Sequence, residues 1–276
     1  RAVPPAADES WFDGLKVVVD CANGAAYRTA PDTLRDLGAE VTAMASEPDG
    51  FNINDGCGAV HPEALAARVV DTGADIGIAL DGDADRLILV DETGARIDGD
   101  QVLACLARTM HEAGTLTGDG IVGTMMTNGG IEPFLDGLGL ALHRTKVGDR
   151  YVLAAMRDNG INLGGESSGH ILMTSLSTSG DGLIAALQML RLLAVDDRPA
   201  SWLFHVFTPK CQKMKNLRGV ERTVLDLPAV VDGLADIESN LAGKGRILVR
   251  ASGTETLLRV MAEADDEAVV DSTISE

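Results

Sequence analysis

The sequence predicts an α/β protein with two consecutive three-layer αβα domains and a small α+β domain behind them. Strand-length apolar runs alternate with helix-length stretches from residue 15 to residue 195, which is typical of layered α/β domains. From about Phe204 the order changes to strand, helix, strand, strand. A chain of 276 residues has room for two or three domains, each with its own core. The expected division is a linker at 1–11 and domains at 12–98, 99–203 and 204–276.

The first αβ unit contains short strand patterns bounded by turn signals. Residues 15–20 are rich in β-branched side chains, and Cys21-Ala22-Asn23-Gly24 has the composition of a turn. The helical stretch that follows ends at Gly38, a residue suited to a left-handed helix cap. The other expected elements are strands at 40–45, 74–80 and 86–91 and a helix at 62–72.

The second unit alternates in the same way and has a similar size, which suggests a repeated fold without convincing sequence identity. Its expected elements are helices at 99–110, from 130, at 149–159 and at 183–195, and strands at 119–125 and 141–146. In the third domain we expect a helix at 227–241 and strands at 246–250 and 257–263. The chain opens in a Pro/Ala segment and stops within a helical stretch near Ser272, which suggests a missing front and a clipped carboxyl end.

Composition disfavours several classes of partner. The 42 acidic and 23 basic residues give a net charge of −19, which argues against nucleic acid and anionic membranes. No apolar stretch approaches the ~20 residues that span a bilayer. The four cysteines form no Cys-x-x-Cys pair, so neither a zinc site nor a disulfide framework is indicated. We expect reduced thiols in a cytoplasmic protein.

An acidic loop between two apolar runs is the strongest chemical signal. Asp81, Asp83 and Asp85 occupy alternate positions, directly before Arg86. In an extended segment every second side chain points the same way, so the three carboxylates can converge on a cation. A hard divalent ion, Mg2+ by preference, suits these oxygen ligands. Arg86 can hold an anion such as a phosphate beside the metal.

Two other interpretations of this loop stay open. Asp and Gly are common turn formers, so it can be an acidic turn between strands. Its carboxylate spacing, with Glu92 at position twelve, also fits a calcium loop. That interpretation requires Gly at position six and flanking helices, whereas Arg86 stands there between β-rich segments.

The loop at residues 164–170 combines glycines with Glu166, Ser167, Ser168 and His170. This mixture suits a polyhydroxylated ligand, because Glu and Ser bond hydroxyl groups and Gly allows close backbone approach. The same residues fit Gly-x-Ser-x-Gly, the hydrolase nucleophile elbow, which requires a strand before it and a helix after it. A plain Gly-rich turn is the third interpretation.

Two further segments could hold phosphate. Residues 250–256 follow one strand pattern and precede another, and they combine hydroxyls, a Gly and Arg250, with Arg259 close behind. An ordinary hairpin has a similar sequence. Lys146 and Arg150 stand at the end of a strand beside a helix start, where anions are favoured, although a capped helix also explains them.

Taken together, the three loops resemble the α-D-phosphohexomutase superfamily. Asp-Gly-Asp-x-Asp-Arg, Gly-Glu-x-Ser-Gly-His and Arg-x-Ser-Gly-Thr-Glu occur in that order. Stretches such as residues 19–25, 49–54 and 146–152 resemble the bacterial branch that acts on glucosamine phosphates. The resemblance implies a four-domain enzyme whose last domain is a small α+β, TBP-like fold. It implies interconversion of glucosamine 6-phosphate and glucosamine 1-phosphate on the way to UDP-N-acetylglucosamine.

The resemblance also implies roles for individual residues. Asp81, Asp83 and Asp85 would bind Mg2+, and Arg86 would lie beside the reacting phosphate. The resemblance implies that Glu166 and Ser168 bind sugar hydroxyls, and that the phosphate that does not react is held by Arg250, Ser252, Gly253, Thr254 and Arg259. Lys146, Arg150 and His170 are further candidate substrate-binding residues. A hexose 1,6-bisphosphate would be the intermediate and activator. The expected partner is a phosphosugar, with no nucleic acid or membrane, and a homodimer is one possible assembly.

Some positions depart from the family pattern. The family's phosphoserine belongs to a first domain, and no Ser here precedes His-Asn-Pro, so we expect this chain alone to be inactive. Ala84 replaces the usual Gly of the metal loop, and Ala251 and Thr256 replace residues that stiffen the phosphate loop. The competing functions are a phosphomannomutase or phosphoglucomutase, and a non-catalytic protein that binds metal and sugar phosphate.

Overall fold

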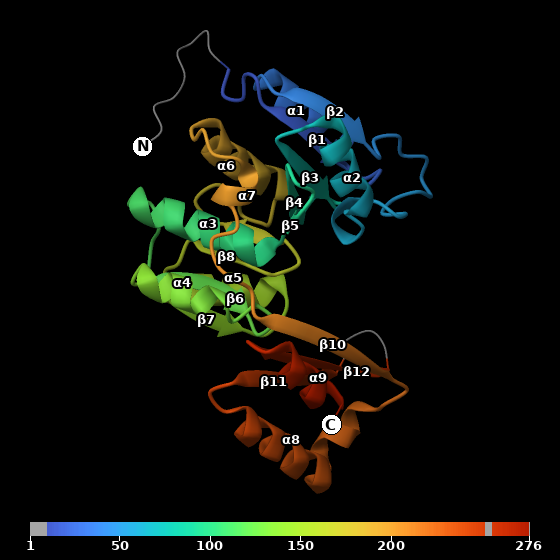
Figure 1. Cartoon of the computed structure of the whole chain (residues 1–276), viewed down its shortest axis with the longest axis vertical. Helices are drawn as coiled ribbons and strands as arrows, with labels where there is room; N and C mark the ends of the chain where they lie inside the picture. The colour runs from blue at the N-terminus through green and yellow to red at the C-terminus, as the bar shows by residue number, and fades with distance from the viewer. Residues whose placement is uncertain (1–9, 252–255, 276) are drawn as a thin grey trace. The chain divides into compact units, whose positions relative to one another are not determined.

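The computed structural model describes residues 10–251 and 256–275 and divides into two compact units (Figure 1). The first unit contains the chain up to Thr127 together with Ile131–Phe207. The second contains Asn128–Gly130 together with the chain from Thr208.

The first sheet of the first unit has the strand order β2-β1-β3-β4-β5. Strands β1, β2 and β3 are parallel, and β4 and β5 continue the sheet in antiparallel fashion. The strands are β1 (Lys16–Asp20), β2 (Glu40–Met44), β3 (Ile76–Leu80), β4 (Leu87–Asp91) and β5 (Arg96–Ile97). The helical elements before β4 are α1 (Thr29–Asp36), η1 (Gly58–Val60) and α2 (Glu63–Thr72). Strands β3 and β4 are buried throughout, which explains their continuous apolar sequences.

The second sheet repeats this plan with the order β7-β6-β8-β9. Strand β6 is parallel to β7 and β8, and β9 returns antiparallel to β8. The strands are β6 (Gly120–Thr124), β7 (Ala141–Thr145), β8 (Leu163–Gly165) and β9 (Ile171–Met173). The helices of this part are α3 (Gly99–Glu112), α4 (Ile131–Gly137), α5 (Asp149–Asn159), α6 (Gly182–Ala194) and α7 (Ala200–Leu203). The predicted repeat is therefore confirmed by strand order, and the β3–β4 turn corresponds to the β8–β9 turn.

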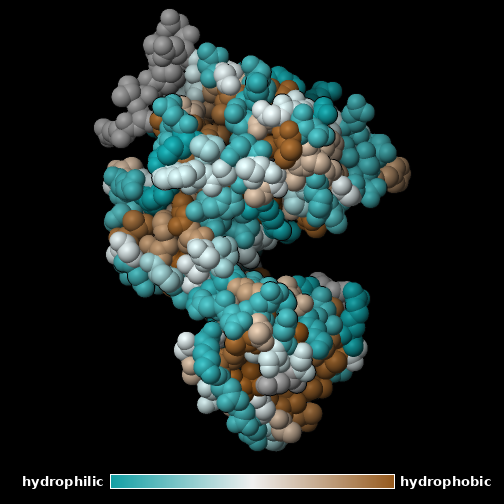
Figure 2. Space-filling model, viewed as in Figure 1, coloured by the Kyte–Doolittle hydropathy of each residue, from teal (hydrophilic) through white to brown (hydrophobic). Residues whose placement is uncertain are grey.

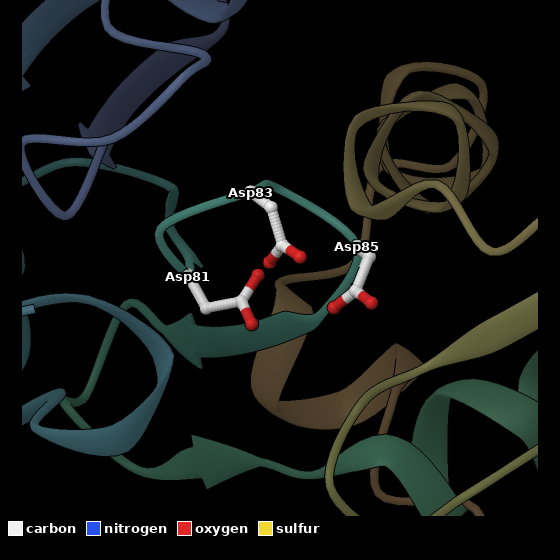
Figure 3. A group of neighbouring side chains, drawn as sticks. All are labelled: Asp81, Asp83 and Asp85. Carbon is white, nitrogen blue, oxygen red and sulfur yellow. The ribbon is translucent and has the colours of Figure 1, made fainter. Parts of the chain in front are cut away.

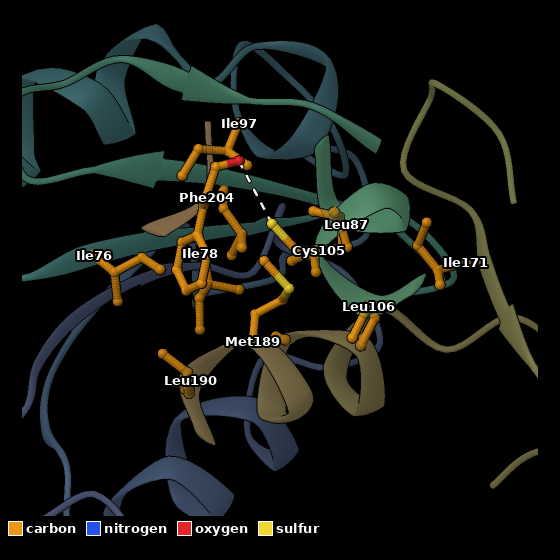
Figure 4. Packing of buried hydrophobic residues seen from close by; sticks show 14 of the residues in the cluster. Ile76, Ile78, Leu87, Ile97, Cys105, Leu106, Ile171, Met189, Leu190 and Phe204 are labelled. Carbon is orange, nitrogen blue, oxygen red and sulfur yellow. Dashed lines mark hydrogen bonds between the residues drawn. The ribbon is translucent and has the colours of Figure 1, made fainter. Parts of the chain in front are cut away.

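Helices cover both faces of the sheets. In the first repeat, Leu65 and Val69 of α2 pack on one face of the sheet, and Leu34 of α1 belongs to a larger cluster on the other face. In the second repeat, α5 covers one face, and α3 and α4 contribute to the larger cluster. That cluster extends from Phe12 to Phe204, and Figure 4 shows its centre, where the Cys105 thiol contacts the Phe204 carbonyl at 3.6 Å. One core therefore supports both repeats.

The C-terminal unit is a three-stranded antiparallel sheet of order β10-β12-β11 with two α-helices. Its elements are β10 (Cys211–Arg218), η2 (Arg222–Asp226), α8 (Pro228–Leu241), β11 (Gly245–Ala251), β12 (Leu257–Ala264) and α9 (Glu267–Ser275). The buried Glu263 carboxylate accepts hydrogen bonds from Arg246, Gln212 and the Gly129 amide. Apolar surface is visible on this unit in Figure 2, where Leu227 and Val231 are half exposed.

The predicted fold class is confirmed, with small differences in the elements. Strand β8 and helix α7 were not predicted, because three residues with two glycines and a four-residue helix carry little periodic pattern. Phe204 is fully buried in the core of the first unit, and the C-terminal unit begins at Thr208. The predicted domain boundaries stay predictions. Among the described residues, no helix is long and apolar enough to cross a membrane.

Candidate active site

Three carboxylates gather in the turn between β3 and β4. Asp81, Asp83 and Asp85 each offer an oxygen within 4.8 Å of the others (Figure 3). The predicted convergence is confirmed, but its geometric basis differs from the extended segment that we expected. The Ala84 amide donates to the Asp81 carbonyl at 3.0 Å, so the loop is a tight turn. Asp81 is buried, Asp85 is half-buried and Asp83 is exposed.

The turn requires a backbone conformation that is unusual for its sequence. Ala84 has a φ of 63°, in the left-handed region, and its carbonyl accepts a hydrogen bond from the Gly182 amide at 2.9 Å. Such a conformation costs roughly 1–2 kcal/mol for an L-residue. In the described chain the other non-glycine residues with positive φ are Ala22, Asn23, Ala45 and Asn54. They lie in loops after β1 and β2, so local strain gathers around the carboxylates, as it often does at functional sites.

Neighbouring loops fix the acidic turn through its backbone. The Ala25 amide donates to the Gly82 carbonyl at 2.8 Å. A Cβ atom on Gly24 would lie 2.3 Å from that carbonyl oxygen, so only glycine fits there. The buried carboxylate of Asp20 accepts from the amides of Ala22 and Gly58, both at 2.9 Å. Burial raises the pKa of Asp20, although both hydrogen bonds oppose this rise. This support was not predicted from the sequence, where its signal is an Asp closing a β-branched run.

The electrostatics of the turn favour a cation. Burial raises the pKa of Asp81, the Arg86 amide at 3.1 Å opposes the rise, and the charges of Asp85 and Asp83 add to it. The Arg86 Nε atom lies 3.6 Å from Asp81 Oδ2 and 3.7 Å from Asp85 Oδ1. Asp85 Oδ1 is buried and accepts no hydrogen bond. Three carboxylates beside one guanidinium, with one buried oxygen that accepts no hydrogen bond from the described residues, fit a hard divalent cation such as Mg2+.

The loop at residues 166–170 connects β8 to β9 and lies directly against the acidic turn. The Leu87 amide donates to the Gly169 carbonyl at 3.0 Å, and Arg86 and His170 form a β-bridge. Gly169 has a φ of 94°, and a Cβ atom there would lie 2.0 Å from the Leu87 carbonyl oxygen. The equivalent turns of the two repeats therefore meet through their backbones.

Two side chains of this loop, His170 and Glu166, contact different neighbouring segments. His170 is buried, with Nδ1 3.2 Å from Asp85 Oδ2. Glu166 accepts a hydrogen bond from the Gly148 amide at 2.9 Å, and Ser168 is exposed. A strand follows the loop instead of a helix, which excludes the hydrolase elbow. The calcium loop is likewise excluded by the strands on both sides of the acidic turn.

The predicted basic pair lies at the start of α5. Lys146 is exposed, and Arg150 stacks on the Tyr151 ring with its guanidinium carbon 4.6 Å from the centroid. Arg150 also donates to the Tyr151 hydroxyl at 2.8 Å. Because Gly148 bonds Glu166, this segment is tied to the loop at residues 166–170.

The predicted phosphate loop belongs to the C-terminal unit. Arg250 on β11 stands directly opposite Arg259 on β12. Like charges at opposed strand positions repel, which favours an anion beside them. The Arg259 Nε atom is buried and makes no hydrogen bond with the residues that the structure describes. Ser252, Gly253 and Thr254 lie outside the described residues.

Known family models match the chain in three consecutive segments. The models that match are "Phosphoglucomutase/phosphomannomutase, alpha/beta/alpha domain II" over residues 4–94, "alpha/beta/alpha domain III" over residues 98–210, and "C-terminal domain" over residues 212–276. Together they cover nearly all of the sequence. The chain belongs to the phosphoglucomutase/phosphomannomutase family, the phosphohexomutases.

Within the family, the relatives with high identity are phosphoglucosamine mutases. The enzyme of Granulibacter bethesdensis is 55% identical over 265 residues, which cover 96% of this chain and 58% of the relative. The enzyme of Phenylobacterium zucineum is 54% identical over 263 residues, which cover 95% and 58%. The chain therefore spans somewhat more than half the length of these relatives.

Solved structures show the same fold. A phosphoglucomutase/phosphomannomutase family protein from Burkholderia thailandensis has a TM-score of 0.79 at 24% identity, over 97% of this chain and 60% of that protein. The N-acetylphosphoglucosamine mutase of Aspergillus fumigatus, in complex with GlcNAc-6P and magnesium, has a TM-score of 0.76 at 21% identity, over 96% and 65%. At these identities the likeness concerns the fold.

Proposed function

We propose that the protein containing this chain is a phosphoglucosamine mutase that interconverts glucosamine 6-phosphate and glucosamine 1-phosphate. The reaction would require Mg2+ and pass through glucosamine 1,6-bisphosphate. The observation that carries this proposal is the carboxylate cluster of the acidic turn, joined by backbone hydrogen bonds to the loop of Glu166 and Ser168. The identity of 54–55% to phosphoglucosamine mutases favours glucosamine among the hexoses.

The proposed metal site uses the three carboxylates of the acidic turn. Asp81, Asp83 and Asp85 would supply oxygen ligands, and Asp85 Oδ1, which is buried and accepts no hydrogen bond from the described residues, is suited to this role. When bound, Mg2+ would neutralise the charge that develops on a transferring phosphoryl group. Arg86 is half exposed and keeps guanidinium nitrogens available for a phosphate oxygen.

Several loops carry proposed substrate contacts. Glu166 is fixed by the Gly148 amide and would orient sugar hydroxyls together with the exposed Ser168. The segment of Lys146 and Arg150 would supply positive charge near this loop, and His170 was also predicted to contact substrate. Arg250 and Arg259, with Ser252, Gly253 and Thr254, would hold the phosphate that does not react. A dianion would relieve the repulsion between the two opposed arginines.

We expect this chain to bind its ligands without catalysing the reaction. The family resemblance assigns the phosphoserine to a first domain, whereas the matches cover domains II, III and the C-terminal domain. We therefore expect the chain by itself to bind Mg2+ and phosphosugar without turnover. A cytoplasmic location and a homodimer also stay predictions, and light scattering of the complete protein tests the latter.

Phosphorus NMR of the complete gene product tests the proposal. Glucosamine 6-phosphate, Mg2+ and a trace of hexose bisphosphate should give a growing glucosamine 1-phosphate signal. Asp83→Asn should reduce the rate at least 100-fold, because it removes one charged ligand. Asp71→Asn, the same change at an exposed position on α2, should leave the rate unchanged.

Other sugars distinguish the competing functions. Conversion of mannose or glucose phosphates, with no conversion of glucosamine phosphate, would favour a phosphomannomutase or phosphoglucomutase, the activities in the family name. Binding of phosphosugars by the complete protein without conversion of any of them would favour the non-catalytic binding protein.

A further inference from the structure

We propose that His170 is a positioning residue for the metal site and acts by holding the Asp85 carboxylate. The inference rests on the metal site of the proposed function, and it gives His170 a different role from the substrate contact predicted from sequence. In this role the Nδ1–H group of His170 holds Asp85 Oδ2, so that Oδ1 of the same carboxylate would stay available to a cation held together with Asp81 and Asp83.

The contact geometry distinguishes the two oxygens of Asp85. Oδ2 lies 3.2 Å from His170 Nδ1, whereas Oδ1 is buried and accepts no hydrogen bond. A carboxylate oxygen only accepts, so the contact is attractive when Nδ1 carries the hydrogen. Arg86 approaches Oδ1 only to 3.7 Å, and its side chain is 46% exposed, compared with 8% for His170. Of the two side chains that contact the Asp85 carboxylate, His170 is therefore held more firmly than Arg86.

The backbone of His170 is fixed on two sides. Its carbonyl accepts from the Glu166 amide at 3.0 Å, and the residue forms a β-bridge with Arg86. Arg86 directly follows Asp85 in the acidic turn. The imidazole is thus attached to the same backbone ladder that carries the carboxylate it contacts, which fixes their separation.

The far side of the imidazole is closed by a glycine. A Cβ atom on Gly180 would lie 2.3 Å from His170 Nε2 and 2.4 Å from Cε1. Nε2 is buried and makes no hydrogen bond. That nitrogen is therefore shielded from a sugar hydroxyl in this arrangement, while Nδ1 is directed to Asp85. Packing of this kind holds a side chain in one rotamer and makes its contact reproducible.

The role predicts a defined loss of metal affinity. Partners that orient a metal ligand typically contribute 10–100-fold to affinity. Because His170 belongs to the loop that contains Glu166 and Ser168, the proposed sugar-binding loop would also orient a metal ligand. This connection between the proposed sugar-binding loop and the metal ligand would not require the substrate to contact the metal.

Calorimetric titration of the chain with Mg2+, supported by electron paramagnetic resonance with Mn2+, tests the inference without measuring activity. His170→Ala should weaken Mg2+ binding 10–100-fold. His170→Asn should restore most of the affinity, because its amide nitrogen occupies nearly the position of Nδ1. His170→Gln should not, because its amide nitrogen corresponds to Nε2. Gly180→Ala should also weaken binding by displacing the imidazole.

Controls separate this inference from the proposed function. His111→Ala removes an exposed histidine at the end of α3 and should leave binding unchanged. Circular dichroism of each variant verifies the fold. Wild-type affinity in His170→Ala, or better rescue by Gln than by Asn, would overturn the positioning role and leave the metal site intact. Absence of Mg2+ and Mn2+ binding by the wild-type chain would overturn the metal site itself.

Discussion

Replacing Gly24 by alanine should displace the acidic turn. The added Cβ atom would lie 2.3 Å from the Gly82 carbonyl oxygen and 2.7 Å from the Gly82 Cα atom. Both are backbone atoms that cannot rotate away, and an ordinary contact begins at 3.4 Å. The two loops must therefore separate by roughly 1 Å, which is enough to disturb the proposed metal site, since functional sites typically require their geometry within about 0.5 Å.

The stability cost of Gly24→Ala follows from the same contacts. Separation lengthens the 2.8 Å hydrogen bond from the Ala25 amide to the Gly82 carbonyl, which contributes about 0.5–1.5 kcal/mol. Overpacking adds about 1–3 kcal/mol. The lower entropy of the unfolded alanine chain offsets about 0.4–1 kcal/mol of this. We expect a net loss of about 1–3 kcal/mol from the first unit.

Scanning calorimetry and Mg2+ titration measure the two consequences. Gly137→Ala is the matched control, since among the described residues no atom outside its chain neighbours and its own helix backbone lies within 4 Å of a Cβ atom added at this end of α4. That change should be neutral or stabilise the same unit by up to about 1 kcal/mol. If Gly24→Ala equals the control in unfolding temperature and in Mg2+ affinity, the contact with Gly82 does not constrain the turn.

Two further predictions concern buried groups of the first unit and one thiol of the second. Burial acts to raise the pKa of Asp91, but hydrogen bonds from Thr93, Ala95 and His205 outweigh it and lower the pKa. Asp91→Asn should therefore reduce the free energy of unfolding at pH 7 by about 1–3 kcal/mol. In urea titrations across pH, this difference should shrink as the pH falls below the unfolded pKa of about 3.9, and a constant difference would contradict the argument. Burial also raises the pKa of Cys21 and of Cys105 to about 12. At pH 8, iodoacetamide and mass spectrometry should find these two thiols unmodified and Cys211 modified in the folded protein, whereas modification of Cys105 at the rate of Cys211 would show that the core opens.

The central strands of the first sheet are predictable because they are buried on both faces. Strands β3 and β4 appear in the sequence as uninterrupted apolar runs, and the helices between strands have clear start and stop signals. Strand β8 was not predicted because Leu163-Gly164-Gly165 resembles a loop in sequence. Its pairing with β6 is a tertiary contact between Val122 and Gly164, which lie far apart in the sequence.

The parts of the candidate site that are formed by residues close together in the sequence could be predicted. The carboxylate spacing indicated a cluster, since all three residues lie within one turn. The left-handed conformation of Ala84 was not expected, because tertiary hydrogen bonding overrides the local preference of alanine. The contact between His170 and Asp85 joins residues far apart in sequence, and no spacing rule reports it. It depends on the meeting of two equivalent turns, which only the repeated strand order reveals.

The strained residues around the acidic turn also limit how the sequence can change during evolution. Ala22, Ala45 and Ala84 hold conformations that glycine or asparagine adopts more easily, so these loops are less stable than other sequences would make them. A lineage released from selection for the activity could regain stability at these positions, as expected where function and stability oppose each other. Selection for thermal stability alone should therefore accumulate changes in these loops, and loss of metal affinity among the survivors would show how closely the strain is tied to the site.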